Sequence, residues 1–371
     1  RPLHRLGAAE ERALAAGPGR RLSLSRAREP RTDGGARRIP KAEIHLHLEG
    51  SVELPTLVGI LRARGENAGP EERARLAALY AHRDFPDFLR NFRRLCSEIR
   101  RPEDFGLIAS ELSRRLQGER VRYAEVFCSP SIFQRLHGLP AVEIMEAVSV
   151  AARRQEKEGG PRLRFLFDGV RQFGVAGMEE TVESASACRA HDVIGIGMGG
   201  DEKSAPTAAF AGPYREARRR GLHTTVHAGE FDGPRSVWEA IDVLEVERIG
   251  HGVRAVEDPE LVRLLARRGV PLECCPTSNL RTGVAPCWDR HPIVDLVRSG
   301  AAVTVNSDDP ALFSTTLVGE WEALQTRLGL GPEEVLAIGV RTARSTFLPE
   351  AEKEALVAEM LRAAAGTGAP A

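Results

Sequence analysis

The chain has 371 residues, of which 42% are hydrophobic and 28% charged, so it can bury a sizeable core within one α/β barrel domain. Its 52 basic and 52 acidic side chains balance, which argues against nucleic acid or an anionic membrane as a partner. No apolar run reaches the roughly 18 residues that a membrane span needs. The six cysteines form no CxxC pair, as is typical of reduced thiols in a cytoplasmic protein.

The first 38 residues differ in composition from the rest of the chain. Residues 1–38 contain ten arginines, few acidic residues and the segments GPGR and DGGARR, which predicts a flexible Arg-rich arm. An Arg-rich leader is also typical of a transit peptide, but Glu10, Glu11, Glu29 and Asp33 weaken that interpretation. We expect residues 39–371 to form a single domain.

From residue 41 onward, short β-rich segments alternate with helical patterns rich in Ala, Leu, Glu and Arg. Several of these patterns end in glycine just before the next strand, as helix C-termini often do. Strand and helix alternate eight times, which predicts a (β/α)8 TIM-type barrel. The expected strands are 42–48, 122–128, 162–168, 193–198, 223–228, 248–251, 271–275 and 301–306.

Between the first two strands, residues 50–120 are too many for one helix, which predicts a helical insertion. Within it, FPDFLRNF places Phe85, Phe88 and Phe92 at helical spacing. Two interpretations stay open: core packing, which we favour, or a hydrophobic lid in which Phe88 and Phe92 contact a substrate. Beyond about residue 332 the pattern predicts C-terminal helices.

Two histidines and an acid share one face of the first strand. In HLHLEG, His45, His47 and Glu49 alternate with apolar residues, and alternate side chains of a strand point to the same side. A lone strand histidine is more often structural than a ligand. Two histidines at positions i and i+2 have Cα atoms about 6.6 Å apart and can bind one ion together. Burying both without a partner costs several kcal/mol.

Further metal-binding side chains follow other strands. His227 ends the fifth strand in TVHAGE, and Asp308 follows the eighth in VNSDDP. A barrel brings the C-terminal ends of its strands to one mouth, where three histidines, an aspartate and a water fit an ion such as Zn²⁺. The sequence has no HExxH, and its HAGE segment is HxxE without PCxxC, which excludes two other zinc templates. The fourth strand, VIGIGMGG, carries no lysine to bridge a second metal, which favours one metal.

The segments HLHLEG, TVHAGE, RIGHG and NSDDP, in this order on eight strands, resemble the adenosine deaminase family of the amidohydrolase superfamily. The resemblance extends from about Arg38 to Leu348 and includes GGDE, GPRSVWEAI and TSNL. Each motif alone is weak, and their joint order and spacing carry the resemblance. It implies a metal-dependent deaminase barrel with one zinc ion per chain, held by His45, His47, His227 and Asp308.

The resemblance also implies roles for other residues. Glu230 would protonate purine N1, for which burial must raise its pKa. His251 would orient the attacking water or help to deprotonate it, and Asp308 would take part in the same step. Asp309 would hydrogen-bond with purine N7, and the backbone N–H of Gly200 would donate to N3.

The substrate is less sharply indicated. Typical adenosine deaminases have an Asp that faces the ribose hydroxyls, where this chain has Glu49. The HLHLEGS segment of this chain also resembles the adenine deaminase branch of the family. GGDE and GPRSVW resemble the enzymes that act on nucleosides. FDGVRQFG resembles enzymes that act on 6-aminodeoxyfutalosine. This segment contains Arg171, which would either support a residue of the site or be structural. We expect adenosine or 2′-deoxyadenosine, with aminodeoxyfutalosine or another 5′-modified adenosine as the alternative and free adenine as a less favoured one.

Two other classes of protein are alternatives to a purine nucleoside deaminase. A binding protein on an inactive deaminase scaffold usually loses a metal ligand or the proton donor, and this chain retains both. A hydrolase of cyclic amides would not need the proton donor Glu230. The intact set of His and acid residues therefore favours an active deaminase.

Overall fold

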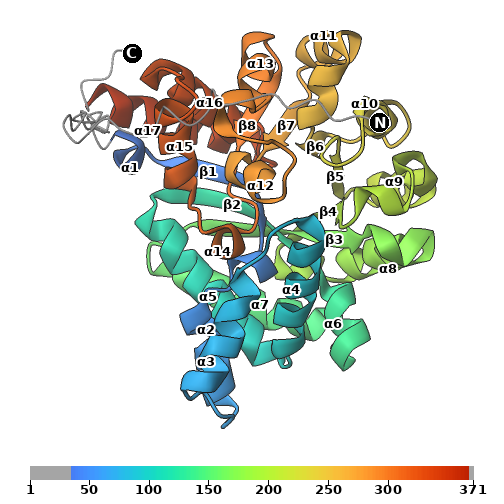
Figure 1. Ribbon diagram of the computed structural model, residues 1–371, viewed down its shortest axis with the longest axis vertical. Helices are drawn as coiled ribbons and strands as arrows, with labels where there is room; N and C mark the ends of the chain where they lie inside the picture. The colour runs from blue at the N-terminus through green and yellow to red at the C-terminus, as the bar shows by residue number, and fades with distance from the viewer. Residues whose placement is uncertain (1–34, 367–371) are drawn as a thin grey trace, which may run out of the picture. The chain divides into compact units, whose positions relative to one another are not determined.

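Eight parallel β-strands follow one another around a barrel in the described residues, 35–366 (Figure 1). They are β1 (Lys41–His47), β2 (Val121–Cys128), β3 (Arg162–Val170), β4 (Val193–Gly199), β5 (His223–Ala228), β6 (Arg248–His251), β7 (Pro271–Cys274) and β8 (Ala302–Val305). Every predicted strand is confirmed, and the largest boundary shift is the extension of β3 from residue 168 to residue 170. This computed structural model therefore has the predicted (β/α)8 architecture.

The barrel closes between β1 and the segment that follows β8. Neighbouring strands pair in sequence order from β1 to β8. Beyond β8, the His47 N–H donates to the Asp308 carbonyl at 2.8 Å, and the Asp308 N–H donates to the His45 carbonyl at 3.1 Å. Asp308 is therefore fixed directly beside the two histidines of β1.

Helices surround the strands, and α2–α5 form the predicted insertion between β1 and β2 (Figure 1). Of the predicted arm, residues 1–34 lie outside the described residues, and residues 35–38 form the short helix α1. The helices are α1 (Gly35–Arg38), α2 (Leu54–Ala63), α3 (Pro70–Ala77), α4 (Phe85–Glu98), α5 (Pro102–Gly118), α6 (Pro130–His137), α7 (Ala141–Lys157), α8 (Gly174–Ala187), α9 (Ala211–Arg219), α10 (Pro234–Asp242), α11 (Pro259–Arg268), α12 (Pro276–Arg281), α13 (Ile293–Arg298), α14 (Pro310–Phe313), α15 (Leu317–Thr326), α16 (Pro332–Arg344) and α17 (Glu350–Ala365).

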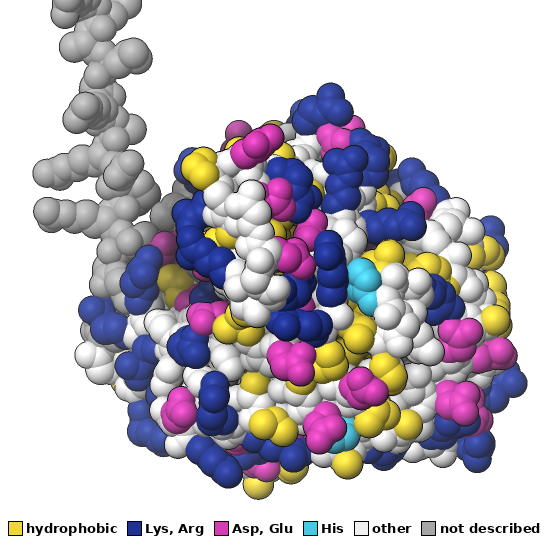
Figure 2. All heavy atoms as spheres, turned by 90° about the horizontal axis from the view of Figure 1, so that it is seen from below, with side chains coloured by type: hydrophobic (Ala, Val, Ile, Leu, Met, Phe, Trp, Pro, Cys, Tyr) yellow, Lys and Arg dark blue, Asp and Glu magenta, His cyan; other side chains and the backbone are white. Residues whose placement is uncertain are grey.

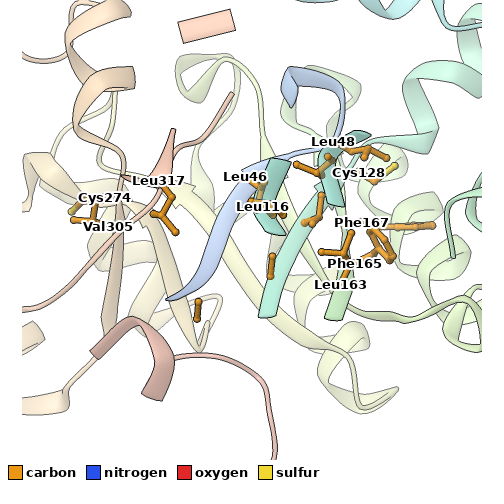
Figure 3. Close-up of a cluster of buried hydrophobic side chains, with 14 of the residues drawn as sticks. Leu46, Leu48, Leu116, Cys128, Leu163, Phe165, Phe167, Cys274, Val305 and Leu317 are labelled. Atoms are coloured by element: carbon orange, nitrogen blue, oxygen red, sulfur yellow. The ribbon is translucent and has the colours of Figure 1, made fainter. Parts of the chain in front are cut away.

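Apolar side chains form the layer between the strands and the helices. On β3, alternate residues Leu163, Phe165 and Phe167 are buried, as expected for a strand with one face against helices. Figure 3 shows them in one cluster with Leu46 of β1 and Leu116 of α5. Each fully buried Leu or Phe stabilises the fold by about 1.5–3 kcal/mol, so this layer holds the strand ends in place.

Inside the barrel, by contrast, several buried side chains are charged. Arg248 of β6 forms ion pairs of 2.6 Å with Glu125 of β2 and with Glu273 of β7. All three side chains are at most 2% exposed. Removing one member of such a network would leave an uncompensated buried charge, so this layer ties three strands together beneath the strand ends.

The mixed charge of the surface and the unpaired cysteines agree with the balanced charge and the absence of a CxxC pair. Figure 2 shows Lys and Arg side chains interspersed with Asp and Glu over one face. Within residues 35–366, none of the helices combines the length and the apolarity of a membrane span. All six cysteines are unpaired, and only Cys287 among them is exposed.

Candidate active site

A cavity of about 540 Å³ lies at the C-terminal ends of the strands. Its floor and one wall come from polar residues at or just after six strands, and its other wall comes from apolar residues of α4 and α6. The polar lining includes His47, Asp168, Gly200, His227, Glu230, His251, Asp308 and Asp309, and the apolar lining includes Phe85, Phe88, Phe92, Ile132 and Leu136. The barrel thus brings together residues that are far apart in sequence, such as His47 and Phe313.

Four histidines converge on the carboxylate of Asp308. The ring centroids of His45 and His227 lie 4.6 Å apart, and those of His45 and His47 lie 5.4 Å apart. Asp308 Oδ1 lies 3.6 Å from His45 Nε2 and 3.3 Å from His47 Nε2. On the other side, Asp308 Oδ2 lies 3.8 Å from His251 Nε2. The predicted ligand residues are therefore all neighbours in space.

Two groups of side chains have the spacing of a metal site, and Asp308 belongs to both. In the larger group, one ligand atom from each residue lies within 4.8 Å of the others, and its members are His45, His227, His251 and Asp308. The smaller group contains His47, Asp308 and Asp309. The larger group includes His251, whereas the sequence prediction has His47 in its place.

The donor set fits a zinc ion. Imidazole nitrogens with one carboxylate oxygen are common zinc ligands, and catalytic sites use three or so protein ligands with a position left for water. The buried His45 Nε2 has no hydrogen-bond partner among the described residues. Such a buried nitrogen needs a hydrogen-bond partner or an ion, and its surroundings supply the other ligand atoms.

Outer hydrogen bonds fix which nitrogen of each histidine faces the cluster. His45 Nδ1 lies 2.7 Å from Glu273 Oε2, and His227 Nδ1 lies 3.1 Å from the Met198 carbonyl oxygen. Since both partners only accept, each Nδ1–H donates and each Nε2 is left to bind an ion. Burial, reinforced by the neighbouring histidines, lowers the pKa of His227 well below its usual value, which keeps this ring neutral.

Two residues of the site have left-handed backbone conformations without being glycine. The φ angle is 59° at His251 and 64° at Asp308. Non-glycine residues in this region are strained and persist only where their surroundings hold them. The two hydrogen bonds between Asp308 and the backbone of β1 provide this support for Asp308. The strain coincides with two of the candidate catalytic residues.

Glu230 lines the cavity as a buried acid beside His251. Its Oε2 lies 3.7 Å from His251 Nε2, and its residue is 7% exposed. Burial raises the pKa of Glu230 well above its usual value, and the charges of Asp308 and Glu202 add to this effect. The side chain is therefore suited to carry a proton near neutral pH and to donate it.

Glu202, which the sequence analysis did not single out, holds the loop that carries Glu230. It lies in the 3-10 helix η5 (Glu202–Ser204), within the GGDE segment quoted for the resemblance. Its buried carboxylate accepts hydrogen bonds of 2.6–3.0 Å from the Ser236 hydroxyl and from the backbone N–H groups of Gly229, Glu230, Phe231 and Asp232. Its place in the GGDE segment after β4 was a weak signal, and no local pattern specifies its hydrogen-bond partners.

We expect Glu202→Gln to lower kcat by about 10- to 100-fold, because a displacement of about 1 Å at a reacting group can reduce the rate about 10²-fold. One oxygen of the carboxylate becomes an NH₂ group that faces backbone donors, so the loop with Glu230 must shift. Bound metal should stay unchanged, since no ligand is touched. Steady-state kinetics and metal analysis check this, with Asp201→Asn on the adjacent residue as the control. An unchanged kcat would contradict the role.

Gly200 and Asp309 both line the cavity, as their predicted roles require. Gly200 has a φ of 92°, where any other residue would be strained, and a Cβ there would lie 2.2 Å from Gln172 Oε1, which would have to move. Burial, followed by the charge of Asp308, raises the pKa of Asp309 to about 8. Asp309 therefore carries a proton at neutral pH and can donate to an acceptor. Its Oδ1 has no hydrogen-bond partner within residues 35–366.

Glu49 differs from the prediction. It does not line the cavity, and its Oε1 accepts a hydrogen bond of 2.8 Å from the Ser129 N–H. The reason is local: β1 ends at His47, and Glu49 begins the 3-10 helix η1 (Glu49–Ser51), so the strand alternation no longer applies. Arg171 is buried and donates to the His227 carbonyl at 2.7 Å, so it supports β5 from outside the metal group.

The aromatic residues of α4 combine both of the roles considered for them. Phe88 is buried and stacks on Phe313 with ring centroids 5.0 Å apart, which is core packing. Phe85 stacks at 3.9 Å on Phe231, the residue after Glu230. Since both residues and Phe92 also line the cavity, α4 forms an apolar wall. The contact of Phe88 and Phe92 with a substrate stays a prediction.

Comparisons with known proteins point the same way. A family model described as adenosine deaminase matches residues 40–363. The chain is 36% identical over 325 residues to an aminodeoxyfutalosine deaminase of Streptomyces avermitilis, covering 87% of this chain and 90% of the relative. It is 37% identical over 320 residues to an adenine deaminase of Chelativorans sp., covering 86% of this chain and 97% of that one.

A solved structure supports both the fold and a metal. An amidohydrolase of Burkholderia ambifaria, solved with bound zinc, superposes with a TM-score of 0.83 at 28% identity. The match covers 91% of this chain and 95% of that chain. These relatives are hydrolytic deaminases or amidohydrolases, and the His and Asp cluster lies where such a barrel places its chemistry.

Proposed function

Because the chain belongs to the adenosine deaminase family of the amidohydrolase superfamily and is a metal-dependent hydrolytic deaminase, we propose that it replaces the 6-amino group of an adenine nucleoside by oxygen, releasing ammonia. We propose one zinc ion per chain as its metal. The observation that carries the proposal is the buried acid Glu230 facing His251 and Asp308 across one cavity.

The metal would be held by the four residues that the resemblance implies. His45, His227 and Asp308 belong to the larger spatial group, and His47 Nε2 lies 3.3 Å from Asp308 Oδ1. When bound, zinc would act as a Lewis acid that lowers the pKa of a coordinated water toward about 7. This chemistry would supply the nucleophile that is needed to replace an aromatic amino group by oxygen.

His251 would orient the attacking water or help to deprotonate it. Burial lowers the pKa of His251 to about 3, so its imidazole is neutral at neutral pH. Its Nδ1 lies 3.4 Å from Asn279 Nδ2, and its Nε2 faces both Asp308 and Glu230. The ring is therefore held on one edge while the other edge faces the reacting atoms.

Three other groups would orient the purine. Glu230 would donate its proton to N1, so that negative charge does not build up in the ring as the tetrahedral carbon forms. Protonated Asp309 would donate a hydrogen bond to N7, and the N–H of Gly200 would donate to N3. The three contacts address different ring nitrogens, which fixes the base in the plane that presents C6 to the water.

We place a 5′-extended adenosine, such as aminodeoxyfutalosine, and plain adenosine or 2′-deoxyadenosine ahead of free adenine. The cavity of about 540 Å³ is larger than a ten-atom base needs, which leaves room for a sugar and a further substituent. The relative named aminodeoxyfutalosine deaminase supports the extended substrate.

Free adenine is the second candidate, and one observation favours it. Glu49, the acid expected to face a ribose, is directed at the Ser129 N–H and does not line the cavity. Relatives named adenine deaminase match at 35% and 37% identity. A site that binds only the base would need no acid that faces a ribose.

A comparison of kcat/KM on three substrates tests this order. Adenosine, aminodeoxyfutalosine and adenine are each added to zinc-loaded protein, and the loss of ultraviolet absorbance at the adenine maximum is followed. We expect a nucleoside to exceed adenine by about 10-fold or more, since contacts beyond the base add transition-state binding. A preference for free adenine would reverse the order and leave the deaminase chemistry in place.

A further inference from the structure

Three arginines line the same cavity as the catalytic residues, at its outer part. Arg90 and Arg93 lie on α4, three positions apart, which makes them neighbours on one helix face. Arg135 lies on α6, which packs against α4. All three residues are exposed. Figure 1 shows α4 and α6 side by side.

Charge is separated along the depth of the cavity. Every carboxylate that lines it is buried, and these are Asp168, Glu230, Asp308 and Asp309. The lining arginines are instead in contact with solvent. Acidic side chains therefore gather where the metal and the base would lie, and cationic side chains gather where a substituent of the base would reach.

The three arginines differ in how they are held. Arg90 forms an ion pair with Asp87, its neighbour on α4. Arg135 pairs with Glu180 at 2.7 Å, and its guanidinium lies 4.2 Å from the centre of the Phe173 ring.

Arg93 is the arginine that is open to a ligand. It has no carboxylate partner within the part of the chain that the structure describes. Its five donors are free to meet an acceptor, whereas Arg135 is fixed in place by its ring and acid contacts.

We propose that this mouth binds an anionic group, a carboxylate or a phosphate, on the 5′ substituent of the purine nucleoside. The proposal rests on the proposed function, because the base must occupy the floor for a substituent to reach the arginines. Guanidinium groups bind carboxylate and phosphate through paired N–H donors, which a neutral substituent cannot match. Arg93 would make the principal contact, and Arg90 and Arg135 would add positive potential.

The test uses two substrates of equal size that differ in charge. The first is 5′-deoxy-5′-(2-carboxyethylthio)adenosine, and the second is its neutral carboxamide. With the zinc-loaded enzyme, we expect kcat/KM to favour the carboxylate by about fivefold or more, and the preference to shrink as salt is raised. A third arm measures kcat/KM for adenosine 5′-monophosphate relative to adenosine. Comparing this ratio with the ratio of carboxylate to carboxamide shows which anion is preferred.

Variants assign the preference to a residue. Arg93→Glu should abolish or invert the carboxylate preference, and Arg93→Gln should reduce it. Arg94→Glu is the matched control, because Arg94 is exposed on the same helix without lining the cavity, and its preference should stay close to that of the wild type. A preference that survives Arg93→Glu overturns the assignment.

Failures of the two proposals are distinguishable. If both analogues and adenosine are deaminated with the same kcat/KM, the anion site is wrong and the deaminase function stands. If none of the three is deaminated by zinc-loaded protein, the nucleoside deaminase proposal is wrong, and the anion site falls with it.

Discussion

The variant Glu230→Gln is expected to keep its fold and its metal while kcat falls by at least about two orders of magnitude. Glutamine has nearly the same shape but carries no proton that it can transfer to a ring nitrogen, and general acid catalysis contributes about 10²–10⁴ in rate. The hydrogen bond from the residue 230 N–H to Glu202 involves the backbone and is retained. The measurement is steady-state kinetics with metal analysis on the same sample.

A matched control separates this effect from a general loss of acid groups. Glu257 is a carboxylate outside the cavity that pairs with Arg254, so Glu257→Gln should keep the wild-type kcat. If Glu230→Gln keeps most of its kcat, proton donation must come from another group, and the raised pKa of Glu230 would have no catalytic meaning.

Substitution of a histidine in the metal cluster is expected to have the second large effect, on bound zinc and on kcat. His47→Ala is expected to lose zinc and activity together, and His251→Ala is expected to retain zinc while kcat falls by about 10²-fold or more. The reason is the assignment of His47 as a ligand and of His251 as the group that receives the proton. Zinc per chain is measured by atomic emission after dialysis, together with kcat.

The opposite pattern has a definite meaning. The larger spatial group contains His251 in place of His47. If His251→Ala loses zinc and His47→Ala retains it, the two residues exchange their assigned roles. His223→Ala is the control, because His223 starts β5, pairs with Glu247 and lies outside the cluster. It should leave both zinc and kcat unchanged.

Much of the fold and of the metal cluster was predictable because the signals are local. Each strand is a short apolar run bounded by glycines and polar residues, and parallel strands in a barrel deliver their ends to one mouth. The positions of His227 and Asp308 at strand ends were sufficient to bring them beside His45.

Contacts set by packing were not predictable from spacing. Glu49 follows His47 by two residues, yet the strand ends between them, which turns its carboxylate to Ser129. Glu202 and Glu273 hold the site from positions 28 and 228 residues away from their partners Glu230 and His45. No local pattern specifies such pairs, since they depend on which strands become neighbours.

The decisive measurement is the deamination of adenosine or a 5′-extended adenosine in water enriched in ¹⁸O. We expect one ammonia released per substrate consumed, and one ¹⁸O atom at C6 of the product, both dependent on bound metal. Metal-loaded protein that releases no ammonia from any adenine compound, or that gives a product without ¹⁸O, would contradict this expectation.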